Sequence, residues 1–143
     1  MKLVLVKVCS FYLFLELKTI YKRSVSGLMK TLYFYKKYEI MNLSQEDWIA
    51  QFEADENAVI LDVRTEEEYN EGIIANAIHI DIQKGQGFIS EIEALDKSKN
   101  YYVYCRSGAR SGRACQIMNE LGFENAYNLL GGILDWEGDT VLP

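Results

Sequence analysis

One cysteine stands where the sequence most strongly indicates nucleophilic chemistry, in the stretch from Tyr101 to Met118. Residues 101–104 are aromatic or β-branched and favour a short strand, and Cys105 follows directly at the carboxyl end of that strand. Open α/β sheets place their ligand sites at the carboxyl ends of their strands. We therefore predict that Cys105 is a catalytic nucleophile.

The six residues after the cysteine are small or cationic, and they predict a loop that can hold an anion. They are Arg106, Ser107, Gly108, Ala109, Arg110 and Ser111. Backbone N–H groups in such a loop can turn inward and form an anion-binding nest around the sulfur. Gly108 permits the backbone angles of a tight turn, and Ser111 is predicted to cap the helix that follows. We assign all six residues to substrate binding.

The surroundings predicted for Cys105 favour its thiolate form. The sulfur faces the amino-terminal end of a helix, where aligned peptide dipoles give a positive partial charge. Such settings lower the pKa of a cysteine from about 8.5 to about 3.5–7.5. A buried core cysteine is the alternative interpretation, but Arg106 and Arg110 lie within six residues of one another and do not suit a core.

The loop sequence CRSGARS, from Cys105 to Ser111, resembles the active-site loop of rhodanese-type sulfurtransferases. Two more stretches agree in order: LDVRTEEEYNEGIIANAIHI at residues 61–80 resembles the second signature of that family, and LGGILDW at residues 130–136 resembles its closing motif. Ile73 stands where the family often has a histidine, so any role of that histidine is absent. The resemblance covers Leu43 to Val141 and implies a single rhodanese-like domain.

The resemblance also implies a mechanism, in which Cys105 carries sulfur as a persulfide. Its thiolate would attack the outer sulfur of thiosulfate or another sulfane donor, and a thiophilic acceptor, such as a thiol or a partner protein, would then take the sulfur. Arg106 and Arg110 would orient the dianion, while the loop amides stabilise the transferred sulfur. We expect no cofactor.

Two other functions stay open for this loop. The domain could carry sulfur or dock a partner without enzymatic turnover. Surface loops recognise the acceptor, and a single sequence does not show which acceptor these loops bind. It could also be a cysteine-dependent phosphatase or arsenate reductase on the same fold. Phosphatases of this kind have a longer loop between cysteine and arginine, whereas four residues separate Cys105 from Arg110. The smaller ring suits one sulfur atom better than a tetrahedral phosphate.

Alternating strand and helix patterns in residues 41–143 predict an α/β fold with a central, mostly parallel sheet and helices on both of its faces. Ser44 and Thr65 are each followed by acidic residues and helical apolar spacing, which indicates helix caps. We expect strands at residues 58–61, 77–80, 101–104 and 126–129, a polar loop at 83–87, and helices after Ser44, after Thr65, at residues 88–95, after Ser111 and at the end of the closing motif.

Four further residues carry reactive or charged groups. Asp62 and Arg64 end the predicted strand at residues 58–61, where they either support the catalytic loop or form a structural ion pair, and we favour the ion pair. His79 is the single histidine and lacks companions for a metal site, so we predict a structural role. Cys115 lies one turn beyond Ser111 and is predicted to be a core residue, with a resolving thiol as the alternative.

Charge divides the chain near residue 40. Residues 1–40 hold eight Lys or Arg and two Glu, a net +6, and because the whole chain carries −6, residues 41–143 carry −12. A domain with this much negative charge repels nucleic acid, so we do not expect nucleic acid as a partner. Three cysteines without a CxxC spacing predict neither a disulfide framework nor a zinc site. They fit a reducing compartment, and we expect a cytoplasmic protein.

Residues 1–40 are predicted to be a basic, aromatic extension separate from the domain at residues 41–143. The apolar run Leu3–Leu17 is interrupted by Lys7 and Glu16 and falls short of the about 20 residues that span a bilayer. Three interpretations stay open: a mis-assigned start with translation beginning at Met41, a peripheral membrane anchor, or an integral part of the fold. Membrane association through this extension is the alternative to a purely cytoplasmic location.

Overall fold

A five-stranded parallel sheet forms the centre of the domain in the computed structural model, which describes residues 39–143. The strands are β1 (Met41–Leu43), β2 (Ala58–Asp62), β3 (Ile78–His79), β4 (Asn100–Tyr104) and β5 (Ala126–Leu129). They lie in the order β1-β5-β4-β2-β3, and the strand pairs among these described residues are all parallel. The predicted α/β fold with a parallel sheet is confirmed, and the interpretations of residues 1–38 lie outside the described residues.

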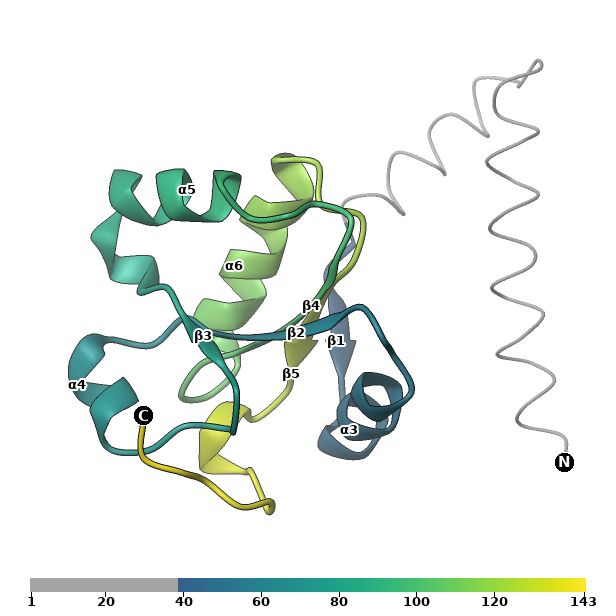
Figure 1. The fold of residues 1–143 in the computed structure, drawn as a ribbon, viewed down its shortest axis with the longest axis vertical. Helices are drawn as coiled ribbons and strands as arrows, with labels where there is room; N and C mark the ends of the chain where they lie inside the picture. Colours follow the sequence, from purple (N-terminus) through teal and green to yellow (C-terminus); the bar gives the residue numbers. More distant parts are fainter. Residues whose placement is uncertain (1–38) are drawn as a thin grey trace, which may run out of the picture. The chain divides into compact units, whose positions relative to one another are not determined.

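Helices cover both faces of the sheet, as the sequence predicted (Figure 1). The α-helices are α3 (Gln45–Glu53), α4 (Glu66–Asn70), α5 (Gln86–Glu93) and α6 (Ala109–Glu120), and the 3-10 helices are η1 (Ile82–Lys84) and η2 (Gly132–Leu134). Figure 1 shows α5 and α6 on one face and α3 on the other. No helix within residues 39–143 has both the length and the apolar character needed to cross a bilayer.

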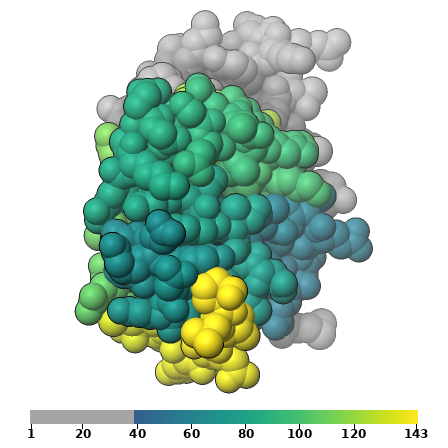
Figure 2. Space-filling view, turned by 60° about the vertical axis from the view of Figure 1, so that its left-hand side comes forward, coloured from purple at the N-terminus to yellow at the C-terminus, as the bar shows by residue number. Residues whose placement is uncertain are grey.

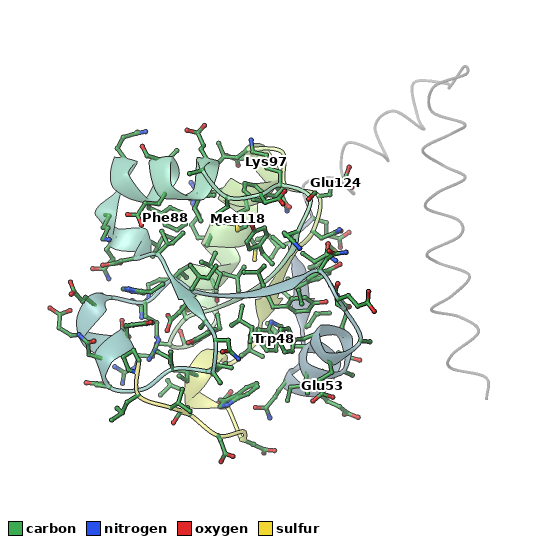
Figure 3. All side chains as sticks on the ribbon, viewed as in Figure 1. Trp48, Glu53, Phe88, Lys97, Met118 and Glu124 are labelled. Carbon is green, nitrogen blue, oxygen red and sulfur yellow. The ribbon has the colours of Figure 1, made fainter. Side chains whose placement is uncertain are left out.

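Side chains of β4 alternate between two apolar cores, one on each face of the sheet. Tyr101 and Val103 pack with residues of α5 and α6, whereas Tyr102 and Tyr104 pack with Trp48 of α3. Figure 3 shows the same division, with Phe88 and Met118 on one side of the sheet and Trp48 on the other. Because side chains alternate along a strand, Cys105 continues the Tyr101–Val103 series and belongs to the core under α6.

Local sequence signals account for the helix starts. The Ser44 hydroxyl accepts a hydrogen bond from the Asp47 amide at the start of α3, at 3.2 Å. At the start of α4, Thr65 and Glu68 form a reciprocal capping box, in which each side chain accepts from the backbone of the other residue. Both caps satisfy amides that have no partner within the helix.

The structure corrects three local predictions and adds one strand. Helix α6 begins at Ala109 with Gly108 in the capping position, so Ser111 lies inside the first turn and does not cap it. The predicted polar loop at residues 83–87 contains the end of η1 and the start of α5. The closing motif forms only the short helix η2, and the strand β1 was not predicted. Short elements depend on tertiary packing, which the residue pattern alone does not encode.

The carboxyl-terminal residues return to the region of α4. Val141 and Ile73 exchange two backbone hydrogen bonds, at 2.8 and 2.9 Å, and form an isolated antiparallel bridge. Figure 2 shows the yellow carboxyl-terminal residues lying against the blue-green segment that includes α4. This bridge holds the chain beyond η2 against the segment that follows α4.

Candidate active site

Cys105 follows β4 directly and lies beneath the loop that leads into α6. Its relative exposure is 0%, and the neighbouring Arg106 and Ser107 are exposed. The strand therefore delivers the sulfur to the carboxyl end of the sheet, next to a helix start, as the sequence predicted.

Backbone amides of the loop point toward the sulfur. The Gly108 amide donates to Cys105 Sγ at 3.1 Å, and the Ser111 hydroxyl lies 3.4 Å from the same atom. Burial raises the pKa of Cys105, but hydrogen bonds from the side chain and amide of Ser111 and from the amides of Ser107 and Gly108 outweigh it, and the pKa lies below its ordinary value. The site favours the thiolate, the nucleophilic form.

The segment from β5 to η2 holds the loop from behind. Ile133 N donates to Cys105 O at 2.9 Å, and Leu134 N donates to Arg106 O at 3.1 Å. Gly132 has φ +60°, and a Cβ there would lie 2.5 Å from the carbonyl oxygens of both Cys105 and Arg106. Only glycine lets the closing motif approach the active-site loop this closely.

The two arginines of the loop occupy different environments. Arg110 forms a bidentate ion pair with Glu68, with both nitrogen–oxygen distances at 2.7 Å, and it also interacts with Cys105. Arg106 is exposed. The Arg110 guanidinium, together with Thr65, lowers the pKa of Glu68 to about 2. Glu68 was not predicted as a partner of the loop, although its place in the TEEE motif marked it as a capping residue.

Asp62 and Arg64 form a buried ion pair at the end of β2. Arg64 contacts both carboxylate oxygens of Asp62, at distances down to 2.6 Å, and donates to Gly72 O at 2.7 Å. Its guanidinium lies 5.5 Å from the ring centre of Tyr104, the residue before the cysteine. The pair thus contacts β4 and the segment after α4, and no hydrogen bond between it and residues 105–111 is recorded for the described residues.

His79 and Cys115 form no hydrogen bond with the loop sulfur within the described residues. His79 stacks on Tyr69 at 4.2 Å, and its Nε2 lies 2.9 Å from Arg64 O. Cys115 has 0% exposure in the core under α6, and burial raises the pKa of its thiol. Across residues 39–143 the structure contains no cluster of three or more metal-binding side chains.

A chain of polar side chains runs from exposed Asn42, on the edge strand β1, to buried Ser111 at the site. The Ser111 hydroxyl lies 2.6 Å from Asn128 Oδ1, and Asn128 Nδ2 lies 2.7 Å from Asn42 Oδ1. Asn42 and Asn128 are register partners in β1 and β5. Sequence reasoning missed both residues, although an asparagine inside the apolar strand AYNL was a signal, since a buried amide needs partners.

Comparisons with known proteins agree on one family. A model of the rhodanese-like domain matches residues 45–139. YtwF, a candidate sulfurtransferase of Bacillus subtilis, is 43% identical over 103 residues, which cover 71% of this chain and 95% of that protein. YrkF, a candidate sulfur carrier protein of the same organism, is 34% identical over 101 residues, covering 71% of this chain and 53% of YrkF.

Two further matches extend this comparison. The thiosulfate sulfurtransferase GlpE of Coxiella burnetii is 40% identical over 79 residues, covering 55% of this chain and 71% of GlpE. The crystal structure of a rhodanese-related protein from Thermoplasma volcanium superposes with a TM-score of 0.61 and 28% identity, covering 72% of this chain and 99% of that one. The chain therefore spans nearly the whole of YtwF and of that structure, and about half of YrkF.

Proposed function

The chain belongs to the rhodanese-like domain family, and from that membership we propose that it is a sulfurtransferase that holds a sulfane sulfur as a persulfide on Cys105. One observation carries the proposal: the Cys105 sulfur accepts a hydrogen bond from the Gly108 amide at the start of α6, and its pKa is lowered. This environment stabilises an anionic sulfur, which both the attacking thiolate and the persulfide contain.

In the first half-reaction, the Cys105 thiolate attacks the outer sulfur of thiosulfate. A new sulfur–sulfur bond forms at Sγ, the bond between the two thiosulfate sulfurs breaks, and sulfite leaves with the electron pair. The products are a persulfide anion and sulfite, so the total charge is unchanged. The name of GlpE, thiosulfate sulfurtransferase, supports thiosulfate as a donor for this chain.

In the second half-reaction, an acceptor such as cyanide or a thiolate attacks the terminal sulfur of the persulfide. The bond to Sγ breaks and Cys105 leaves as the thiolate, which restores the starting state of a two-step, ping-pong scheme. The amides of Ser107, Gly108 and Ser111 stabilise negative charge at the sulfur in both steps. Removing one such donor in an oxyanion hole costs about 3–4 kcal/mol of transition-state stabilisation.

Arg106 and Arg110 have different roles in binding the sulfur donor. Arg106 is exposed directly after Cys105, and it attracts the approaching dianion. Arg110 is anchored by Glu68, so it supplies a fixed positive charge beside Cys105. Because Cys105 is fully buried, the residues that cover the sulfur must shift for the donor to reach it.

The test is thiosulfate:cyanide sulfur transfer by the purified chain, with thiocyanate and sulfite measured as products. We expect Cys105→Ser to abolish transfer and Cys115→Ser, which changes a buried cysteine outside the active-site loop, to leave it nearly unchanged. Incubation with thiosulfate alone should add the mass of one sulfur atom to the peptide that contains Cys105. Hydrolysis of a phosphate ester without sulfur transfer would overturn the proposal in favour of a phosphatase.

A sulfur carrier is the second candidate, and the name of YrkF favours it. A carrier accepts one sulfur per molecule and releases it only to a docked partner protein. An enzyme with small acceptors forms many equivalents of thiocyanate per chain. Product formation that stops at one equivalent would therefore assign the carrier function.

A further inference from the structure

The Ser111 hydroxyl stands between two acceptors, one of which is the reactive sulfur. Its oxygen lies 2.6 Å from Asn128 Oδ1 and 3.4 Å from Cys105 Sγ. Ser111 and Cys105 are completely buried and Asn128 is 2% exposed, so no solvent competes for these groups. A hydroxyl carries a single hydrogen, and it can donate fully to only one of them.

The distances favour Asn128 as the main acceptor of that hydrogen. Hydrogen bonds between two oxygens have lengths of about 2.5–3.0 Å, and those from a nitrogen to an oxygen are centred near about 2.9 Å. The 2.6 Å contact therefore fits a hydroxyl that donates to the amide oxygen. Asn128 Nδ2 donates to Asn42 Oδ1 at 2.7 Å, and this hydrogen bond orients the Asn128 side-chain amide with its oxygen toward Ser111.

We propose that Asn128 is a positioning residue that competes with Cys105 for the Ser111 hydrogen and thereby keeps the cysteine sulfur more basic than the loop amides and a fully donated hydroxyl together would make it. Asn42 fixes the orientation of the Asn128 amide from the neighbouring strand. The loop amides ionise the sulfur, and Asn128 limits how far the hydroxyl adds to their effect. This inference concerns the thiol itself and, in its kinetic part, rests on the proposed function.

The basicity of the sulfur affects the two half-reactions in opposite directions. Nucleophilicity of a thiolate falls as its pKa falls, with a Brønsted coefficient of about 0.4–0.5, whereas a thiolate of lower pKa leaves faster. At a pH where the thiol is fully ionised, a hydroxyl that donates to Sγ would therefore slow attack on the donor and speed transfer to the acceptor. By holding the hydrogen, Asn128 favours loading of the persulfide.

Other charged groups near the sulfur must stay constant in the test. Arg110 and Cys115 on α6 interact electrostatically with Cys105. After β2, Asp62 and Arg64 are paired with each other. Asn128 contacts none of these four through a recorded hydrogen bond, so a neutral substitution at residue 128 changes the hydroxyl and leaves these charges in place.

The experiment measures the pKa of Cys105 in the full chain, from the pH dependence of its alkylation by iodoacetamide, with the modified peptide quantified by mass spectrometry. In Asn128→Leu the hydroxyl loses its preferred acceptor and turns to the sulfur, and we expect the pKa to fall by about one pH unit. An unchanged or raised pKa in this variant would overturn the proposal. A purely structural role for Asn128 predicts no such fall.

Two further variants isolate the hydroxyl. We expect Ser111→Ala to raise the pKa of Cys105 by well under one pH unit, because Asn128 takes the larger share of the hydrogen in the native chain. A rise of about one pH unit would refute the proposal. In the double variant with Ser111→Ala, the fall caused by Asn128→Leu should disappear. Asn125→Leu is the matched control, since it breaks another asparagine–asparagine hydrogen bond of 2.7 Å, beside β5 and away from the loop.

If Asn128→Leu does not fold, Asn128→Asp tests the same proposal. Asn128→Asp retains the acceptor and adds negative charge, so it raises the pKa, and that rise should be smaller when Ser111 is alanine. Equal rises with and without the hydroxyl would overturn the proposal. In single-turnover assays, Asn128→Leu should slow persulfide formation and speed its transfer. If the native chain transfers no sulfur while the pKa pattern holds, the proposed function fails and this inference stands.

Discussion

At the scale of single residues, burial and ionisation compete at Cys105. Removing a thiolate from water disfavours its charge, and at Cys115, where burial dominates, the pKa is raised. Cys105 is just as buried, yet its pKa is lowered because hydrogen-bond donors surround the sulfur. The two cysteines of the described domain therefore differ in their donors and not in their exposure.

This difference predicts selective reactivity of the two thiols. We expect iodoacetamide at neutral pH to modify Cys105 at least about 100-fold faster than Cys115, because the thiolate is the reacting form. Peptide mapping by mass spectrometry measures both rates in one sample and separates them from Cys9. In denaturant the two rates should converge. Comparable modification of both cysteines in the native chain would show that the donor ring does not control ionisation.

At the scale of elements, one ion pair joins α4 to α6. Glu68 ends the capping box of α4 and binds Arg110 in the first turn of α6. Since the folded chain lowers the pKa of Glu68 from 4.5 to about 2, the pair stabilises the fold fully above about pH 4.5. Its contribution is lost as the pH falls toward about 2, because protonation of Glu68 removes the charge.

Glu68→Gln tests this contribution and leaves the cap in place. A glutamine oxygen can still accept from the Thr65 amide, so the cap is kept, whereas the charge and one of the two hydrogen bonds from Arg110 are lost. We expect about 1 kcal/mol lower unfolding free energy at pH 7, with a difference from the native chain that shrinks between pH 4.5 and 2. Urea unfolding across this pH range measures it. A difference that persists at low pH would assign the loss to packing.

The approach of η2 to the active-site loop gives a second prediction at this scale. Gly132 and Gly122 both have positive φ, at +60° and +93°, but only at Gly132 would a Cβ meet backbone, whereas nothing lies within 4 Å at Gly122. We expect Gly122→Ala to lower the unfolding free energy by about 1–2 kcal/mol through strain alone. Gly132→Ala should cost about 3 kcal/mol or more and reduce sulfur transfer, because it displaces the carbonyls of Cys105 and Arg106.

Thermal unfolding and thiosulfate:cyanide assays of both variants separate strain from displacement. Gly122→Ala should retain its activity at a temperature where it is folded. If Gly132→Ala were equally active and no less stable than Gly122→Ala, the contact between η2 and the loop would not position the cysteine.

For the whole molecule, local patterns predicted the sheet and the loop but not the contacts between distant segments. The strand before Cys105 and the glycine after it were readable because propensity and turn chemistry are local. The Glu68–Arg110 and Asn128–Ser111 contacts span 42 and 17 residues, and β1 pairs with β5 from the far end of the domain. Such pairings follow from the topology of the sheet, so a single sequence without that topology does not reveal them.

The division of the chain near residue 40 leads to the last prediction. The structure separates a compact unit at residues 38–143, and Ile40 packs against its core while its carbonyl accepts from the Asn42 amide at 3.1 Å. We propose that a chain beginning at residue 38 folds and transfers sulfur as the full chain does. A chain beginning at Met41 lacks the Ile40 contacts and should lose about 1 kcal/mol of unfolding free energy.

Thermal unfolding and thiosulfate assays compare the full chain with the chains that begin at residue 38 and at Met41. Sedimentation with anionic lipid vesicles tests the peripheral membrane contact proposed for the basic extension. Because residues 1–40 carry +6 and residues 41–143 carry −12, only the full chain offers a positive segment to an anionic surface. We expect the full chain alone to sediment with the vesicles, and to be released at high salt because charge drives the contact. If the chain beginning at residue 38 failed to fold, the extension would be an integral part of the domain. If all three lengths sedimented equally with the vesicles, residues 1–40 would not be the membrane anchor.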